Sequence, residues 1–229
     1  MIEVFRFPKS RIIRGVFLER LNRFAGRVLI DGVEELVHIH DPGRIPLLRD
    51  GRSVLLLRIP KGDLQKRKTK YDLLAFWNRN EWIFSHSGFH SQIFENILRK
   101  NILWFRGELR KEVRVRDSRI DFMVNSSLIE VKGCTWIRNN CCYFSDAPTS
   151  RGRRHLRELA RYVKSHGRAY IVFLAFSLHG RCIRLARDVD RVFYEEALSA
   201  RRSGVRFLGL RLVFDGEKIY YVDLIPVLF

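Results

Sequence analysis

The first third of the chain alternates short apolar segments with turn signals. Apolar positions recur over residues 12–30, residues 35–40 alternate apolar and polar, and residues 54–59 form an apolar run. Turn-forming residues separate these segments at Asp31-Gly32 and Asp41-Pro42-Gly43. Short strands at this spacing predict a small β-barrel, and a five-stranded OB-type barrel is the leading interpretation.

The rest of the chain mixes helical and strand periodicity. Apolar stripes predict helices over residues 92–103, with Ser91 as the cap, 148–166 and 188–202, with Asp188 as the cap. Strands are expected over residues 109–116, 118–124, 129–133, 169–176, 205–213 and 218–222. The run at 169–176 is apolar throughout, which is typical of a central strand covered on both faces. We therefore expect an α/β sheet flanked by helices over residues 85–229, after a β-domain over residues 1–84, and an α+β protein overall.

Three ionisable residues lie on the hairpin predicted around residues 118–133: Asp121, Glu130 and Lys132. Because strand side chains alternate between faces, Glu130 and Lys132 project from the same face. Charges on a mostly apolar strand are costly unless the face opens on a cleft or the charges are paired. Carboxylates hold hard cations such as Mg²⁺, and a lysine can orient water or offset negative charge. The spacing alone leaves open a metal site or a surface hairpin with one salt bridge.

The balance of charge favours a polyanionic partner. Among 229 residues, 43 Lys and Arg oppose 25 Asp and Glu, a formal net charge of +18. Nucleic acid is the simplest such partner, although a basic surface that serves solubility is the alternative. Two clusters extend this prediction, a run that contains Lys66, Arg67, Lys68 and Lys70, and the first turns of a helix with Arg151, Arg153, Arg154 and His155. Cations at a helix start suggest an anion nearby, because the helix dipole opposes them.

The hydrophobic share of 46% indicates a folded protein, and no apolar run has the length of a signal peptide or membrane span. We therefore expect a cytoplasmic protein with no membrane partner. The cysteines are Cys134, Cys141, Cys142 and Cys182, and none forms a C-x-x-C pair. Reduced thiols are expected, and a disulfide is left open.

Several ordered motifs identify a family resemblance. They are Arg23-Phe24-Ala25-Gly26-Arg27-Val28, Lys66-Arg67-Lys68-Thr69-Lys70-Tyr71, Ser118-Arg119-Ile120-Asp121-Phe122, Ile129-Glu130-Val131-Lys132, and Asp146-Ala147-Pro148-Thr149 through His155-Leu156-Arg157-Glu158-Leu159. With these motifs the chain resembles the sugar fermentation stimulation protein A family. The resemblance implies an N-terminal OB-like domain and a C-terminal domain of the PD-(D/E)XK nuclease type.

The resemblance also implies roles for individual residues. The metal ligands would be Asp121, Glu130 and Glu95, with Mg²⁺ or Mn²⁺ as the cofactor and Lys132 as a further catalytic residue. Without the resemblance, Glu95 would be an ordinary surface glutamate. The residues expected to contact nucleic acid are Arg23, Arg27, Lys66, Arg67, Lys68, Lys70, Arg119, Arg151, Arg153, Arg154 and His155.

The chain departs from the family pattern in a few places. Asp41-Pro42-Gly43 replaces the usual Asn-Thr-Gly, Phe144-Ser145-Asp146 replaces Phe-Pro-Asp, Arg153-Arg154 replaces Gln-Lys, and His90 replaces a frequent asparagine. Two functions remain open: a Mg²⁺-dependent DNA phosphodiesterase, and a non-catalytic DNA-binding protein with a regulatory role in sugar metabolism. RNA as the substrate and a homodimeric state are also left open.

Overall fold

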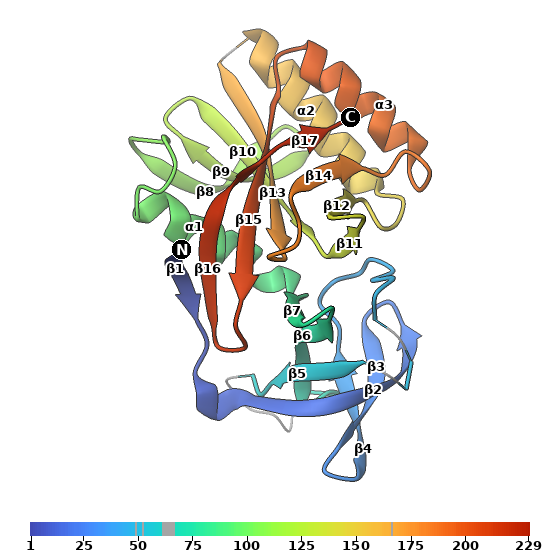
Figure 1. Ribbon diagram of the computed structural model, residues 1–229. Coiled ribbons are helices and arrows are strands. Elements are labelled where there is room, and N and C mark those ends of the chain that lie inside the picture. The colour runs from blue at the N-terminus through green and yellow to red at the C-terminus, as the bar shows by residue number, and fades with distance from the viewer. Residues whose placement is uncertain (49, 52, 61–66, 166) are drawn as a thin grey trace.

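The computed structural model describes residues 1–48, 50–51, 53–60, 67–165 and 167–229. Figure 1 shows two parts, a barrel of N-terminal strands at the bottom and a larger sheet with helices above it. The barrel strands are β2 (Ile12–Asn22), β3 (Ala25–Ile30), β4 (Val33–His38), β5 (Val54–Arg58) and β6 (Tyr71–Asn78).

The barrel closes in the way that an OB-type barrel does. Its strands follow the order β4-β3-β2-β5-β6, and a parallel contact between β4 and β6 completes the ring. Alternate residues of β3 are buried, as the period of two requires for a strand with one face on a core. The prediction of a five-stranded OB-type barrel is confirmed.

The larger sheet is built around β13 (Arg168–Phe176), which is buried along almost its whole length. It lies parallel to β10 (Ser127–Cys134) and to β15 (Arg206–Phe214). The sheet continues with β9 (Ser118–Val124) and β8 (Leu109–Val115) on one side, and with β16 (Lys218–Ile225) and β1 (Ile2–Arg6) on the other. The central position expected for residues 169–176 is confirmed.

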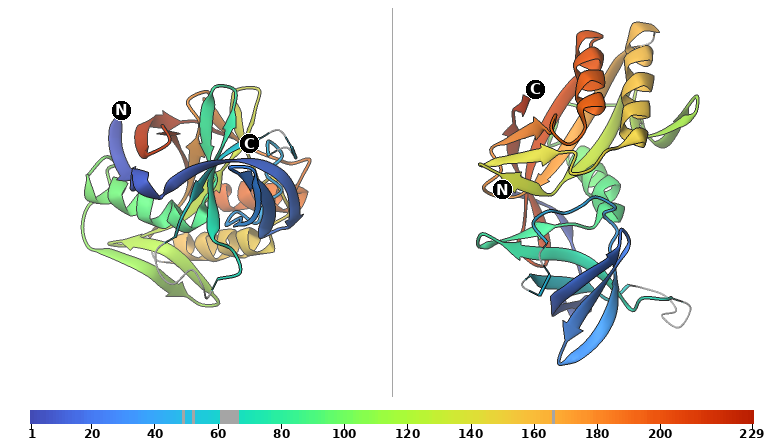
Figure 2. Two further views of the ribbon diagram at one scale, coloured as in Figure 1. Left: turned by 90° about the horizontal axis from the view of Figure 1, so that it is seen from below. Right: turned by 90° about the vertical axis from the view of Figure 1, so that its right-hand side faces the viewer.

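Helices cover both faces of this sheet. On one face, α2 (Ser150–Ser165) and α3 (Arg191–Arg202) bury Leu156, Leu159 and Phe193 against the odd-numbered residues of β13. On the other face, α1 (His90–Arg99) buries Phe94 against the even-numbered residues of β13. Figures 1 and 2 show α2 and α3 side by side, away from α1. The expected mixed sheet flanked by helices is therefore confirmed.

Two strands join the parts. β7 (Glu81–Phe84) pairs with β6 of the barrel and reaches β15 through Trp82 and Phe214. β1 pairs with β16, so the first strand of the chain belongs to the larger sheet before the chain enters the barrel. The division expected near residue 85 stays a prediction, but the N-terminal strand crosses it.

Some local expectations were wrong. The first helix begins at His90 and ends at Arg99, not over residues 92–103, and Ser91 lies inside it, not at its cap. Asp190, not Asp188, caps α3 by accepting a hydrogen bond from Phe193 N at 3.0 Å. The stretch after Gly133, which showed no regular pattern, contributes to a small second sheet of β11 (Trp136–Arg138), β12 (Cys141–Phe144), β14 (Cys182–Leu185) and β17 (Val227–Leu228).

The expectation of reduced thiols is also wrong. Disulfides join Cys134 to Cys142 and Cys141 to Cys182. Adjacent residues of a strand point to opposite faces, so Cys141 and Cys142 on β12 reach different partners. Cys141 lies directly opposite Cys182 in the ladder between β12 and β14, while Cys142 meets the end of β10. The Cys134–Cys142 bond therefore ties the small sheet to β10, the strand that carries Glu130, whereas Cys141–Cys182 joins two strands within the small sheet.

Candidate functional site

A cavity of about 790 Å³ opens where the barrel meets the larger sheet. The barrel contributes Arg23 and the loop that follows β4, and the larger sheet contributes the β9–β10 hairpin and the segment before α2. The ionisable residues on its walls are Arg23, His40, Asp41, His90, Asp121, Glu130, Lys132, Tyr143, Asp146 and Arg151. The predicted hairpin residues Asp121, Glu130 and Lys132 are therefore brought together, and they face a cavity.

The hairpin brings the two acids close to each other. The described ladder between β9 and β10 ends at the pair formed by Phe122 and Ile129, one step before Asp121 and Glu130. Beyond this point Asp121 Oδ2 accepts a hydrogen bond from Val131 N at 2.7 Å. The Asp121 carboxylate thus accepts the hydrogen bond of a backbone N–H, that of Val131, beyond the last residue pair of this ladder.

Glu130 is a buried carboxylate, with an exposed fraction of 2%. Its Oε1 accepts hydrogen bonds from Lys132 Nζ at 2.5 Å and from His155 Nδ1. Burial alone would raise the pKa of Glu130, but the Lys132 charge and the His155 hydrogen bond outweigh it and hold that pKa below its usual value. Its Oε2 is buried without a hydrogen-bond partner in the described part of the chain.

Asp121 is shifted in the opposite direction. Burial and the neighbouring charge of Glu130 raise the pKa of Asp121 to about 6. Within the part of the chain that the structure describes, the hydrogen-bond contact of its second oxygen is a long one, 3.5 Å, with Ser91 Oγ of α1. Two carboxylates that disfavour each other's charge, one with an unpartnered buried oxygen, form a donor set that suits a hard divalent cation. The residues present therefore fit the predicted metal.

Glu95 does not join this pair. It is not among the residues that line the cavity, and its carboxylate forms ion pairs with Arg99 and Lys111, each at 2.8 Å. These hydrogen bonds, led by that from Lys111, lower the pKa of Glu95. Its place as a ligand stays a prediction that this arrangement does not support. Ser91, one turn earlier on the same helix face, is the residue of α1 that meets Asp121.

The four basic residues at the start of α2 lie in different surroundings. Arg151 lines the cavity, as a phosphate contact would require, and Arg154 is exposed outside it. Arg153 is bound to the helix-capping Asp190 at 2.7 Å. His155 has an exposed fraction of 1% and is bound to Glu130. His155 was expected to contact a phosphate, but in the structure it instead binds Glu130.

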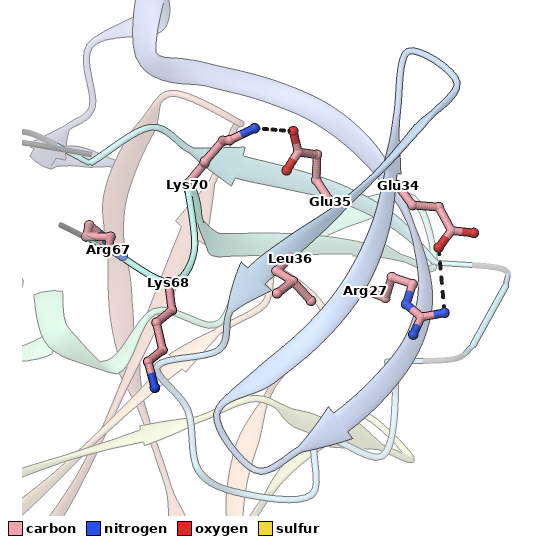
Figure 3. Close-up of a pocket in the computed structure, with 7 residues that line it drawn as sticks. All are labelled: Arg27, Glu34, Glu35, Leu36, Arg67, Lys68 and Lys70. Atoms are coloured by element: carbon pink, nitrogen blue, oxygen red, sulfur yellow. Dashed lines mark hydrogen bonds and ion pairs between the residues drawn. The ribbon is translucent and has the colours of Figure 1, made fainter. Parts of the chain in front are cut away.

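The basic residues expected on the barrel lie in two places. Arg27, Arg67, Lys68 and Lys70 line an open hollow of about 440 Å³, together with Glu34, Glu35 and Leu36 (Figure 3). Arg23 instead lines the cavity. Lys66 lies outside the described residues. Arg119 is exposed beside Glu112 and is not among the residues that line either space.

Two aspartates that were not predicted as site residues meet across the two parts. Asp146 Oδ2 accepts a hydrogen bond from Ile45 N of the barrel at 2.8 Å. Burial and the charge of Asp146 raise the pKa of Asp41 to about 6. A Cβ atom at Gly43 would lie 2.3 Å from Asp146 Oδ1, so only glycine allows this approach. The signal in the sequence was that both aspartates lie in segments that depart from the family pattern.

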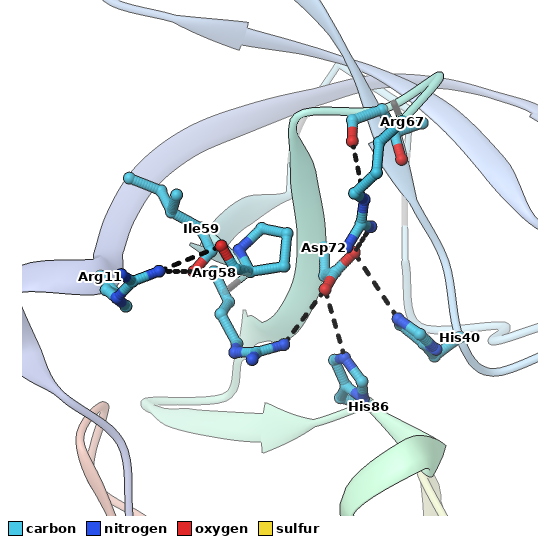
Figure 4. Close-up of polar contacts among 9 residues, drawn as sticks. Arg11, His40, Arg58, Ile59, Arg67, Asp72 and His86 are labelled. Atoms are coloured by element: carbon cyan, nitrogen blue, oxygen red, sulfur yellow. Dashed lines mark hydrogen bonds and ion pairs between the residues drawn. The ribbon is translucent and has the colours of Figure 1, made fainter. Parts of the chain in front are cut away.

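A second group could in principle hold a metal. The ligand atoms of His40, Asp72 and His86 lie within 4.8 Å of one another (Figure 4). However, Arg58 and Arg67 bind the two oxygens of Asp72, Arg58 at 3.2 Å. Their positive charges compete with a cation for the same carboxylate. The group is therefore best described as a buried carboxylate neutralised by arginine, at the junction between the barrel and α1.

Family models match both parts of this chain. A family model described as the SfsA N-terminal OB domain matches residues 18–85, and one described as the sugar fermentation stimulation protein RE domain matches residues 88–218. The chain belongs to the sugar fermentation stimulation protein A family. The chain combines an OB domain with a restriction-endonuclease-like domain, as the resemblance implied.

Relatives of this chain match it over most of its length. The sugar fermentation stimulation protein homologue of Thermotoga maritima is 44% identical over 204 residues, which cover 89% of each chain. The homologue of Methanothermobacter thermautotrophicus is 37% identical over 216 residues, 90% of this chain and 89% of that one. The fold is also similar to the solved structure of Pyrococcus furiosus SfsA in complex with Ca²⁺. That match spans 100% of each chain, with a TM-score of 0.90 and 25% sequence identity. Among the described residues of this chain, no helix combines the length and apolar character needed to cross a membrane.

Proposed function

We propose that this protein is a metal-dependent nuclease that hydrolyses a phosphodiester bond of DNA in the cavity between its two domains. The observation that carries the proposal is the pairing of Asp121 with Glu130 at the wall of that cavity. An acid pair in which the buried Glu130 has an unpartnered oxygen is costly to maintain, and a divalent cation would lower this cost. A protein that only binds DNA would have no need of this arrangement.

Each residue has a task in the proposed reaction. Asp121 and Glu130 would hold Mg²⁺ or Mn²⁺, which lowers the pKa of a bound water and neutralises phosphate charge. Lys132, at 2.5 Å from Glu130 Oε1, would orient the attacking water and offset the negative charge that develops on the phosphate. Arg151 lines the same cavity and would hold a flanking phosphate.

The Ca²⁺ in the Pyrococcus furiosus relative supports a divalent cation in the family. Ca²⁺ and Mg²⁺ both take oxygen ligands, and they differ in size and geometry. We therefore extend divalent-cation binding to this chain as part of the proposal, with Asp121 and Glu130 as the ligands. Location in the cytoplasm and a homodimeric state remain predictions.

The second candidate is a DNA-binding protein that does not cut, with a regulatory role. The net charge of +18 and the OB domain favour it, since both serve binding without chemistry. It predicts binding that weakens steeply with salt and no cleavage in any metal. Whether the ligand or substrate is RNA and not DNA is tested by assaying both polymers.

The deciding experiment is cleavage of labelled single- and double-stranded DNA and RNA with Mg²⁺ or Mn²⁺. The parent should cut, and Asp121→Asn and Lys132→Ala should each cut at least about 100-fold more slowly. Glu112→Gln is the matched control, since Glu112 is an exposed acid on the neighbouring strand β8. Equal cleavage by Asp121→Asn, Lys132→Ala and the parent would contradict the proposal.

A second measurement separates the metal from the chemistry. Ca²⁺ or Mn²⁺ should raise the melting temperature of the parent, because a ligand that binds only the folded state stabilises it. The shift should vanish in Asp121→Asn and persist in Glu112→Gln. A parent that binds the cation and DNA but cuts neither polymer would favour the non-catalytic candidate.

A further inference from the structure

The outer face of the β3–β4 hairpin carries a row of exposed and half-buried side chains that the proposed chemistry does not use. Val37 and Ile39 point into the barrel core, so Leu36, His38 and His40 point outward. Arg27 lies opposite Leu36 in the ladder, and Ala25 lies opposite His38. The row therefore runs along the strands that OB barrels use to bind oligonucleotides.

Phe24 is the unusual member of this surface. It lies in the turn between β2 and β3, and its side chain is 45% exposed. Its ring is nearly parallel to that of His38, with 16° between the planes and 6.4 Å between the centroids. The guanidinium of Arg23 lies 4.7 Å from the Phe24 centroid. An exposed ring beside a cation is the arrangement that proteins use to stack a base and hold its phosphate.

The backbone holds Phe24 in place independently of its ring. Phe24 N donates to Asn22 Oδ1 at 2.8 Å, and Phe24 O accepts from Ile39 N at 2.8 Å. These bonds fix the turn between β2 and β3 whatever side chain is present at this position. The ring is therefore preorganised for contact with a partner, and its removal should leave the barrel folded.

The row connects the two spaces described above. At one end, Leu36 belongs to the basic hollow with Arg27 and Lys68 (Figure 3). Within the described residues, Lys68 forms no ion pair, so its charge is available to a phosphate. At the other end the ring of His38 lies 4.3 Å from that of His40, which lines the cavity of Asp121 and Glu130. We name the row Leu36, Phe24, His38 and His40 the barrel track.

We propose that the barrel track binds single-stranded nucleic acid, with one base stacked on Phe24 and the strand continuing from the basic hollow into the cavity. Single strands are favoured because only unpaired bases expose a face for stacking. Charge complementarity supports a polyanion, since cations lie at both ends of the track: Lys68 in the hollow, Arg23 at the cavity. The link to cleavage rests on the proposed function, whereas the binding itself does not.

The test is fluorescence anisotropy of labelled dT12 and U12, and of a duplex of the same length, with EDTA present so that no metal takes part. Phe24→Ala should weaken binding of at least one single strand by about 5- to 100-fold and leave duplex binding within about twofold. Phe24→Tyr and Phe24→Trp should bind like the parent. Tighter binding of one polymer by the parent identifies DNA or RNA as the preferred strand.

Trp77→Ala is the matched control, because Trp77 is a 42% exposed ring of the same barrel that lies outside both spaces. It should leave oligonucleotide binding unchanged. Unchanged single-strand binding by Phe24→Ala would overturn the proposal, and so would equal losses for single strand and duplex. If binding depends on Phe24 but no cleavage occurs in Mn²⁺, the proposed nuclease activity is refuted and the proposed binding on the barrel track is supported. Failure of one proposal can therefore be told from failure of the other.

Discussion

Asp121 on β9 accepts a hydrogen bond from the backbone N–H of Val131 on β10 at 2.7 Å, just where the ladder between the two strands ends. The bond fixes the carboxylate beside Glu130, so the geometry of the acid pair is set by the hairpin itself. It leaves the other oxygen of Asp121 toward the cavity, with Ser91 as a distant neighbour. The site is therefore preorganised by strand pairing before any ligand binds.

Asp41→Asn should stabilise the protein at pH 7. Burial and Asp146 raise the pKa of Asp41 to about 6, so its charge opposes folding, and asparagine can still accept the hydrogen bond from Gly43 N. The gain should be about 1–2 kcal/mol. Between about pH 6 and pH 4 the folded parent binds more protons than the unfolded chain, so its stability rises as the pH falls. The advantage of the variant should therefore disappear near pH 4.

Urea unfolding of the parent and Asp41→Asn from pH 4 to pH 8 measures this difference. Asp31→Asn is the control, because Asp31 is an exposed residue of a barrel turn. It should change stability little at every pH. A constant difference between parent and Asp41→Asn across the range would show that the charge of Asp41 is not its cause.

His155→Ala should lower cleavage and stability but leave DNA affinity unchanged. His155 is buried and holds Glu130 Oε1, so its loss leaves a buried carboxylate with fewer partners, at a cost of about 1–3 kcal/mol. Glu130 would then be less well oriented for the cation. Oligonucleotide affinity in EDTA, the apparent affinity for Mn²⁺ and the melting temperature separate these effects. A main loss in DNA affinity, with stability unchanged, would restore the phosphate-gripping role.

Periodicity in the sequence was enough to predict the barrel, the central strand and the hairpin, because each depends on local alternation and short turns. The closeness of Asp121 and Glu130 follows from the hairpin alone. The burial of His155 could also have been found, since it shares a helix face with Leu156 and Leu159. Because Arg151, Arg153 and Arg154 precede it, His155 was instead grouped with them as a phosphate contact.

Other features depend on contacts between distant segments. The pairing of β1 with β16 joins the two ends of the chain, and no local pattern marks it. The ion pair of Glu95 with Lys111 depends on how α1 lies against β8. The disulfide pairing could not be predicted because the small sheet that brings Cys141 beside Cys182 was not recognised. In each case tertiary structure decides which of several local options is used.

Asp72→Asn should destabilise the protein more than the loss of an exposed ion pair. Asp72 is 1% exposed and bound by Arg58 and Arg67, so the change leaves two guanidinium groups without their anion, at a cost of about 3–5 kcal/mol. Glu35→Gln removes the more exposed pair with Lys70 and should cost at most about 1 kcal/mol. Similar small losses for both variants would contradict this view of the cluster.

The same cluster also makes a prediction about pH and metal. Burial alone would raise the pKa of Asp72, but the nearby rings of His40 and His86 and the ion pair with Arg67 outweigh it and hold that pKa well below its usual value. Its stabilising effect is therefore complete above about pH 4 and is lost as the pH falls below that. EDTA should not reproduce the loss seen in Asp72→Asn, because arginine, not metal, neutralises the carboxylate. An equal loss on chelation would instead indicate a metal held by His40, Asp72 and His86.

The two disulfides should differ in their contribution to stability. In the chain-entropy model the effect grows with the length of the closed loop. Cys141–Cys182 spans 41 positions and Cys134–Cys142 spans 8, so the model assigns about 4 kcal/mol to the first and about 2.5 kcal/mol to the second. Urea unfolding of the double serine variants of each pair measures the two contributions. Thiol titration of the unfolded parent without reductant should find no free cysteine. Four free thiols in that sample would contradict both bonds, whereas a larger loss from the shorter loop would show that strain or packing, not chain entropy, sets their effect.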